Sequence, residues 1–476
     1  MREKLQTDKQ AEFSANERIP GKVYAAVIAT GILSFSGVIV ETSMNIAFPT
    51  LMREFGVSTN IVQWMTSIYL LTLSIVVPLS ANLKARFATK SLFLTAAAFF
   101  MAGLLTDALA PVFPVLLFGR VLQGVGTGLA LPLMYNIIIE QVPLAKRGSM
   151  MGGANVITGI APAVGPTFGG IVISTLGWRW VFWILLPLLL VSLFLGIWGI
   201  QQKSKLVKAP VDLPSFVAIV VLFFGLLFGL SNLSSGRFFT FSCGGCMLIG
   251  LLALFCLTWR SRQLANPILD LSLFKNRNFA LQMLGFFLLQ TMSLGHAFLL
   301  PNYIQLVNGK SALLAGIVVL PAGCVSALLC IVGGRLYDEH GARKPVLLAG
   351  TCVFLEVAVM LLLVKQLTPV TIGVIYPFYM GGMAITMCCI MTDALNQLPA
   401  RQQTQGNAIM TTLQQFAGAF GTSVTTAVVA LSQAQAGSKG SAATAQGTRL
   451  AFMLMLLFAL VMLAAFLAST KDKQAD

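Results

Sequence analysis

Charged residues are scarce in this sequence. Asp, Glu, Lys and Arg make up 10% of its 476 residues, whereas 57% are apolar. A water-soluble domain carries about 25% charged residues, so a soluble fold of this length could not cover its own surface. The sequence excludes soluble enzymes, nucleic-acid-binding proteins and secreted disulfide-rich domains. The net charge of +15 comes from Lys and Arg lying between the apolar runs, so we expect no nucleic-acid partner.

Patterns typical of cofactor and metal sites are also missing. The C-x-x-C formed by Cys243 and Cys246 has no second pair or histidine nearby to complete a zinc site. The phosphate-loop pattern G-x-x-x-x-G-K-[ST] does not occur, so ATP is not the expected energy source. The two histidines, His296 and His340, are predicted on opposite sides of a membrane, which argues against a membrane-embedded enzyme. We expect no cofactor and no bound metal.

Long apolar runs are what the sequence has in abundance. A membrane-spanning helix needs about 20 apolar residues, and an open sheet cannot satisfy its backbone in lipid. We therefore predict an all-α integral membrane protein with 14 spanning helices. Their predicted ranges are 22–47, 61–81, 91–110, 113–137, 149–174, 180–200, 213–232, 239–259, 279–302, 312–333, 345–365, 369–392, 406–431 and 448–468.

The distribution of basic residues predicts the orientation. An even number of spans places both termini on one side. With the termini in the cytoplasm, 23 of the 31 Lys and Arg lie in cytoplasmic segments and seven in outer ones. Such an excess follows the positive-inside rule. We therefore expect cytoplasmic tails at 1–21 and 469–476, with the first apolar run kept as an anchor because no small-residue cleavage site follows it.

A weak internal repeat divides the chain. The loop after the tenth span reads G-R-L-Y-D-E-H-G-A-R-K (334–344), and 81–90 after the second span has the same frame with alanine in place of both glycines and the aspartate. Each loop follows the second helix of a six-helix block if the seventh and eighth spans are an insert. The predicted domains are six-helix bundles at 22–200 and 279–468, with two inserted helices and their linkers at 201–278. Such repeats are typical of transporters.

Four segments resemble motifs of the major facilitator superfamily, in particular its fourteen-spanner drug:proton antiporters. They are V-E-T-S-M-N-I-A-F-P (40–49), F-G-R-V-L-Q-G-V-G-T-G (118–128), A-P-A-V-G-P-T-F-G-G (161–170) and the loop at 334–344. The first has glutamate where the family usually has aspartate. The order of the motifs and the helices that carry them also match the family.

The resemblance implies a major facilitator fold and a function. The expected activity is proton-coupled export of lipophilic, often cationic drugs across the cytoplasmic membrane of a bacterium. The same machine dedicated to one compound, such as tetracycline, an amino acid or an endogenous metabolite, is the alternative. Partners would be small-molecule drugs, protons and the lipid bilayer, and we expect a monomer.

Charged residues inside the spans are the main candidates for proton coupling, because a mid-bilayer charge costs at least about 2.5–3.5 kcal/mol. Glu41 and Arg120 each lie about 9–11 Å below the outer surface at 1.5 Å per residue. Equal depth permits direct pairing or sequential coupling between them. Burial favours the neutral acid and a nearby arginine favours the carboxylate, so a change in their separation can load and release a proton.

Two further candidates lie in the second half. Glu356, near the middle of its span, is either a second proton or cation site or a protonated residue in a helix contact. His296 is either a proton relay or a packing histidine. Asp107 and Asp393 fall at the ends of their spans, where we expect them to meet water.

Substrate binding and gating have their own candidates. Aromatic, amide and Met side chains suit an adaptable lining for flat apolar drugs. The predicted drug-binding residues are Glu41, Asn45, Trp64, Tyr69, Gln123, Met292 and Met383, and any one of the aromatic or Met residues can instead be ordinary packing. The predicted gate comprises Asp338, Arg343 and Arg335 as a cytoplasmic ion-pair latch, with Gly165 and Pro166 at a bend between closely packed helices.

Overall fold

The computed structural model describes residues 19–202, 212–232, 240–264, 267–435 and 440–470, and every regular element in these ranges is helical. Most of the predicted N-terminal tail, part of the first linker and most of the C-terminal tail lie outside them. The N-terminal bundle comprises α2 (Gly21–Glu54), the short α3 (Thr59–Val62), α4 (Trp64–Arg86), α5 (Thr89–Ala108), α6 (Phe113–Gln141), α7 (Leu144–Thr175) and α8 (Arg179–Gly199).

The C-terminal part has the same plan. An inserted pair, α9 (Leu213–Ser231) and α10 (Cys246–Ser261) with the short η2 (Phe241–Gly245), is followed by η3 (Leu271–Lys275). The C-terminal bundle comprises α11 (Arg277–Leu306), α12 (Ala312–His340), α13 (Arg343–Leu363), α14 (Pro369–Asn396), α15 (Ala400–Gln435) and α16 (Ser441–Ser469). Each predicted apolar run overlaps one of these long helices, and most helices extend several residues beyond the run.

Local sequence explains several helix boundaries. Asp212, Asn276 and Thr368 cap the first turns of α9, α11 and α14 with their side chains. Proline follows the cap directly at the start of α14, where its missing N–H costs nothing. Gly341 ends α12 with a φ of +70°, a conformation that favours glycine. Gly341, the second glycine of the 334–344 loop, therefore terminates a helix.

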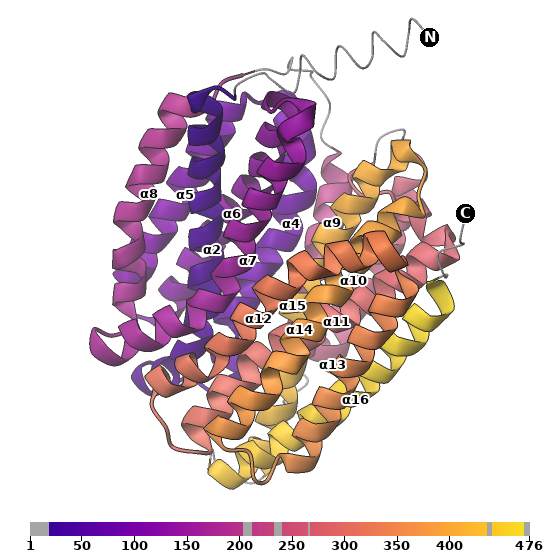
Figure 1. Ribbon diagram of the computed structural model, residues 1–476. Coiled ribbons are helices and arrows are strands. Elements are labelled where there is room, and N and C mark those ends of the chain that lie inside the picture. The colour runs from indigo at the N-terminus through magenta and orange to yellow at the C-terminus, as the bar shows by residue number, and fades with distance from the viewer. Residues whose placement is uncertain (1–18, 203–211, 233–239, 265–266, 436–439, 471–476) are drawn as a thin grey trace, which may run out of the picture.

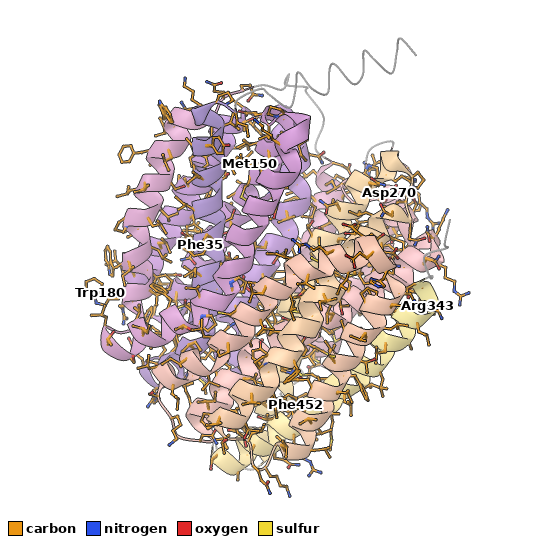
Figure 2. The ribbon with its side chains drawn as sticks, in the orientation of Figure 1. Phe35, Met150, Trp180, Asp270, Arg343 and Phe452 are labelled. Carbon is orange, nitrogen blue, oxygen red and sulfur yellow. The ribbon has the colours of Figure 1, made fainter. Side chains whose placement is uncertain are left out.

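Most of these helices have the length and composition of membrane spans. Within the described residues, 12 helices are long and apolar enough to cross a membrane. The outer face of α8 illustrates the fit, because Trp180 and Trp198 near its ends are 48% and 59% exposed. They are 18 residues apart, or about 27 Å, which is close to the thickness of a hydrocarbon core, and tryptophan is typical of both membrane interfaces. Figure 2 shows Trp180 at the outer edge of the molecule.

The helices pack as two groups that lie side by side (Figure 1), indigo to magenta for the N-terminal bundle and orange to yellow for most of the C-terminal one. The inserted pair lies at their junction. Helix α9 packs against both α4 and α15, and Phe223 stacks on Phe416 of α15 with ring centroids 4.6 Å apart. Trp64 of α4 contacts Phe224 and Phe228 of α9. The insert therefore covers the seam between the bundles.

Hydrogen bonds between the two bundles concentrate at one end of the molecule, opposite Gly21, where α2 begins, and Ser469, where α16 ends. We call this end the far face and the other the terminal face. Ser67 Oγ lies 3.2 Å from Ser423 Oγ, and Gln305 Nε2 donates to the Ile46 carbonyl at 3.1 Å. Within the described residues, all the side-chain hydrogen bonds between the bundles lie in the far halves of their helices. The bundles are therefore joined at the far face.

Candidate functional site

Glu41 lies on the face of α2 that packs against α4 and α6. Gly37 and Asn45, one turn to either side, mark this face. A Cβ on Gly37 would lie 2.5 Å from Thr127 Oγ1 of α6, and Asn45 Oδ1 accepts a hydrogen bond of 2.7 Å from Thr66 on α4. Glu41 is 8% exposed, and within the described residues its carboxyl group makes no hydrogen bond or ion pair. An acid in this position has no fixed partner.

Arg120 of α6 is fully buried and firmly held. Its Nε donates to the Met65 carbonyl at 2.9 Å, and its Nη1 donates to Gln123 Oε1 at 2.5 Å. The guanidinium carbon lies 4.4 Å from the centroid of the Tyr69 ring, a cation–π arrangement. Because arginine stays charged in proteins, this network keeps a permanent positive charge inside the N-terminal bundle.

Asp107 is not at a wet helix end, and that prediction is wrong. Its side chain is 0% exposed, and its Oδ2 accepts a hydrogen bond of 2.9 Å from Gln123 Nε2. The reason is the close approach of α5 and α6, where Gly103 and Gly119 have no side chains to separate the backbones. A Cβ on Gly103 would lie 2.6 Å from the Gly119 carbonyl, and one on Gly119 would collide with the Asp107 carboxylate.

The structure places Glu41 and Arg120 in one electrostatic cluster without joining them. Arg120 interacts electrostatically with Asp107, Tyr69 and Glu41, but within the described residues no ion pair joins Arg120 to either carboxylate. Of the two predicted alternatives, direct pairing is therefore not present in this conformation. Sequential coupling remains a prediction.

A second buried cluster lies in the C-terminal bundle, where the structure brings His296 and Glu356 together. His296 Nε2 of α11 lies 3.4 Å from Glu356 Oε2 of α13, and both side chains are 0% exposed. The other ring nitrogen, Nδ1, lies 2.8 Å from the Met292 carbonyl. Tyr379 stacks on the imidazole at 4.2 Å between ring centroids, and Tyr376 at 5.8 Å. Aromatic rings thus cover a titratable pair.

Most of the remaining predicted lining residues lie in these clusters or at the seam. Tyr69 lies under Arg120, and Gln123 connects Arg120 to Asp107. Met292 is fully buried next to His296, Met383 is half-buried on α14, and Trp64 packs against α9.

The predicted cytoplasmic latch lies at the terminal face. Arg335 and Asp338 are exposed near the end of α12, and Arg343 begins α13 at the edge of the bundle (Figure 2). Asp338 and Arg343 each have an interacting partner. Their neighbour Tyr337 fixes the end of α12 to α14, because its hydroxyl accepts from Asn396 Nδ2 at 3.0 Å and lies 3.4 Å from Asp393 Oδ1.

The first copy of the loop makes an equivalent connection with different chemistry. Lys84, which occupies the position of Tyr337 in the repeat, pairs with Glu140 Oε1 at 2.5 Å. Both contacts fasten the second helix of a bundle to the fourth helix at the terminal face. The first loop has Ala85 where the second has Asp338, and its ion pair is the one between Lys84 and Glu140.

The predicted bend residues lie where α7 packs between α2 of its own bundle and α12 of the other. Ser43 of α2 donates to the Gly165 carbonyl at 2.7 Å. On the opposite side, the backbone of Gly316 on α12 lies against the Pro166 carbonyl, and Thr167 Oγ1 donates to the Gly316 carbonyl at 3.0 Å. Helix α7 runs unbroken through both of its prolines. Gly165 thus packs within the N-terminal bundle, and Pro166 lies at the interface between the bundles.

Two features escaped sequence reasoning, the burial of Asp107 and the His296–Glu356 contact. Depth along the helices is the signal in the sequence that could have found the second pair. Counted from the far ends of their helices, His296 is ten residues deep and Glu356 seven. That difference is about 5 Å at 1.5 Å per residue, which is within the reach of their side chains.

Comparisons with known proteins agree with this architecture. A family model described as Major Facilitator Superfamily matches residues 30–422. The chain is 36% identical over 439 residues to a lincomycin resistance protein, LmrB, of Listeria innocua, and 92% of each chain is covered. It is 27% identical over 419 residues to the multidrug export protein EmrB of Haemophilus influenzae, covering 85% of this chain and 80% of that one.

Solved structures resemble the fold as a whole. A bacterial homologue of the human lysosomal transporter Spinster, in an inward-facing and unoccupied conformation, superposes with a TM-score of 0.66 at 16% identity, covering 95% of this chain and 98% of that one. The Escherichia coli xylose transporter XylE in an inward open conformation gives a TM-score of 0.62 at 13% identity, with 95% and 97% covered.

Proposed function

The chain belongs to the major facilitator superfamily and is a multi-pass membrane transporter rather than an enzyme, and from this premise we propose that it is a proton-coupled multidrug exporter of the bacterial cytoplasmic membrane. Its substrates are lipophilic and often cationic drugs. The names of its relatives, which describe lincomycin resistance and multidrug export, support export of antibiotics. Export of a single compound is the alternative.

The observation that carries the proposal is the unpartnered acid in the N-terminal bundle. A carboxylate buried in a membrane protein is costly unless a positive charge or a proton neutralises it. Glu41 has no fixed partner, whereas Arg120 is held by Met65 and Gln123. A proton and a cationic drug can therefore neutralise Glu41 alternately, so that binding of one displaces the other. Asn45 and Tyr69 lie beside it as polar and aromatic contacts for a drug.

The proposed topology has all 14 long helices crossing the membrane with both termini in the cytoplasm. Its support is the basic-residue bias, together with the packing of α7 and α15 inside the helix bundles: α7 packs on α2 and α12, and α15 on α4, α11 and α16. The far face is then the outer face. Because the bundles are joined there, this conformation is inward-facing, and export requires those contacts to break while contacts at the terminal face form.

The pair in the C-terminal bundle is the proposed second proton site. If Nδ1 of His296 donates to the Met292 carbonyl, the neutral ring presents a lone pair at Nε2, which a carboxylate would repel. The 3.4 Å contact is favourable when one proton is present, either on Glu356 or as the second proton of the imidazole. We assign one shared proton to this pair in the inward-facing conformation.

We assign the loop that contains Asp338, Arg343 and Arg335 to the cytoplasmic latch. We propose that the transporter works as a monomer.

The central test is ethidium efflux from cells that express Glu41→Gln. The amide keeps the shape of the acid but cannot exchange a proton, so efflux should be abolished while the amount of protein in the membrane is unchanged. Glu41→Asp is the matched control and should keep partial activity. Proton-driven efflux that survives in Glu41→Gln, as judged by its loss on adding a protonophore, would refute the assignment.

The same assay separates the alternatives. Energised efflux of several unrelated dyes by the wild-type protein supports a multidrug exporter, and transport of one compound alone supports a dedicated one. Efflux that does not respond to a protonophore contradicts proton coupling in either case.

A further inference from the structure

The buried acid Asp107, for which the proton-exchange scheme above has no role, gives the N-terminal cluster its charge balance. We propose that Asp107 is the fixed counter-charge of Arg120 and thereby sets the affinity of Glu41 for protons and cations. This inference deepens the proposed function and rests on it. Asp107 acts here as a positioning residue for charge, because it contacts neither Glu41 nor a substrate.

The hydrogen-bond chain from Arg120 points a donor at Asp107. Arg120 has only donors, so the oxygen of the Gln123 amide must accept from its Nη1, and the amide nitrogen must then face Asp107. Gln123 Nε2 donates to Asp107 Oδ2 at 2.9 Å, while Oδ1 is buried without a partner in the described part of the chain. A donor aimed at the carboxyl group, with the arginine charge behind it, favours the ionised form of the acid. The Gln123 amide thus connects the guanidinium of Arg120 on α6 to the carboxyl group of Asp107 on α5.

The packing also keeps Asp107 in place. Gly103 and Gly119 bring α5 and α6 so close that a methyl group on Gly119 would collide with the carboxylate. Asp107 and Arg120 are both 0% exposed, whereas Glu41 retains 8% exposure. The cluster therefore has two enclosed groups, Asp107 and Arg120, and one acid with access to its surroundings.

An ionised Asp107 changes the net charge of the cluster formed by Glu41, Arg120 and Asp107. With Asp107 ionised, the cluster is neutral when Glu41 is protonated and carries one negative charge when it is not, so a monovalent cation restores neutrality. Without Asp107, Arg120 alone would neutralise an ionised Glu41. Glu41 would then release its proton readily and attract a cation weakly.

No other titratable group disturbs this balance within the described part of the chain. Tyr69 on α4 is the remaining titratable group in contact with Arg120. Toward the ends of these helices, Glu140 of α6 pairs with Lys84 near the terminal face, and Glu54 of α2 pairs with Arg179 at the far face. Both pairs are internally neutral.

The test measures ethidium binding by fluorescence to the purified full-length protein in detergent across a range of pH. In the wild type, affinity should fall with decreasing pH as protons compete at Glu41. In Asp107→Asn, the pH midpoint should move down by about one unit or more, and the affinity above the midpoint should fall about tenfold. Ser192→Ala removes a different buried hydrogen bond, from Ser192 Oγ to the Ala29 carbonyl, and should leave both values unchanged.

Arg120→Gln supplies the opposite change and a second route to a decision. Its midpoint should move up, and the double variant Asp107→Asn/Arg120→Gln should lie below Arg120→Gln, because removing the acid again eases loss of the Glu41 proton. This comparison decides the question even if Asp107→Asn alone does not fold. Unchanged midpoints in the Asp107 variants, with pH-dependent binding in the wild type, overturn this inference alone. Binding by the wild type that is independent of pH overturns the proposed function as well.

Discussion

The two bundles bury titratable groups in different ways. In the N-terminal bundle, a permanently charged arginine is fixed by amide, carbonyl and aromatic contacts, and Glu41 stands apart from it. In the C-terminal bundle, Glu356 lies 3.4 Å from His296, a group that can itself lose its charge, and tyrosine rings cover the pair. The first arrangement suits exchange of an external cation for a proton. The second suits storage of a proton within the protein.

The contrast implies a division of labour between pH and voltage. Exchange of one proton for one monovalent cation at Glu41 moves no net charge, so only a pH gradient drives it. A second proton carried by His296 and Glu356 would move one charge in each cycle, worth about 2.3 kcal/mol per 100 mV. The predictions below test whether the bundles differ in this way.

The largest effect is expected from Arg120. Arg120→Ala leaves the buried Asp107 without its counter-charge and should stop drug transport. Arg120→Lys should restore about a tenth of the activity or less, because a point charge cannot bond Met65 and Gln123 together as the planar guanidinium does. Efflux rates normalised to the amount of protein in the membrane measure both variants. Full activity in Arg120→Lys would mean that only bulk charge matters.

A smaller, selective effect is expected from Glu356→Gln. In vesicles with an imposed potassium–valinomycin potential and no pH gradient, the wild-type protein should move a monocationic dye in response to voltage. The variant should respond to a pH gradient alone, since the amide cannot carry the second proton. If the variant keeps the full voltage response, Glu356 is a packing residue and the comparison between the bundles fails.

The smallest effect is expected at the inserted pair, where an ion pair lies outside the bundles. Hydrogen bonds from Arg260, and then from Ser215, lower the pKa of Asp212 from 3.8 to about 2. The contribution of this pair to stability is present above pH 3.8 and is lost as the pH falls towards 2. Asp212→Asn should lower the midpoint of thermal unfolding by about 1 °C or less at pH 7. The difference from the wild type should vanish near pH 2, and a difference that grows in acid would contradict it.

Hydropathy was sufficient to locate the helices, because each long apolar run has to satisfy its backbone within itself. The buried charges that interrupt these runs, Glu41, Arg120 and Glu356, were found for the same reason. Burial by neighbouring helices could not be predicted. Asp107 looked like a helix end in the sequence, and its cover comes from a glycine contact between α5 and α6. His296 and Glu356 are 60 residues apart, and their contact depends on how α11 and α13 face each other.

The position of Trp64 in the seam gives the protein an intrinsic optical probe. Its indole packs against Phe224 and Phe228 of α9, whereas the other five tryptophans lie at α8 or on α10. Indole emission depends on the polarity and packing around the ring, so separation of α4 from α9 during transport would change the colour and yield of this one fluorophore. Replacing the other five by phenylalanine would leave a transporter whose cycle can be followed in real time without any attached label.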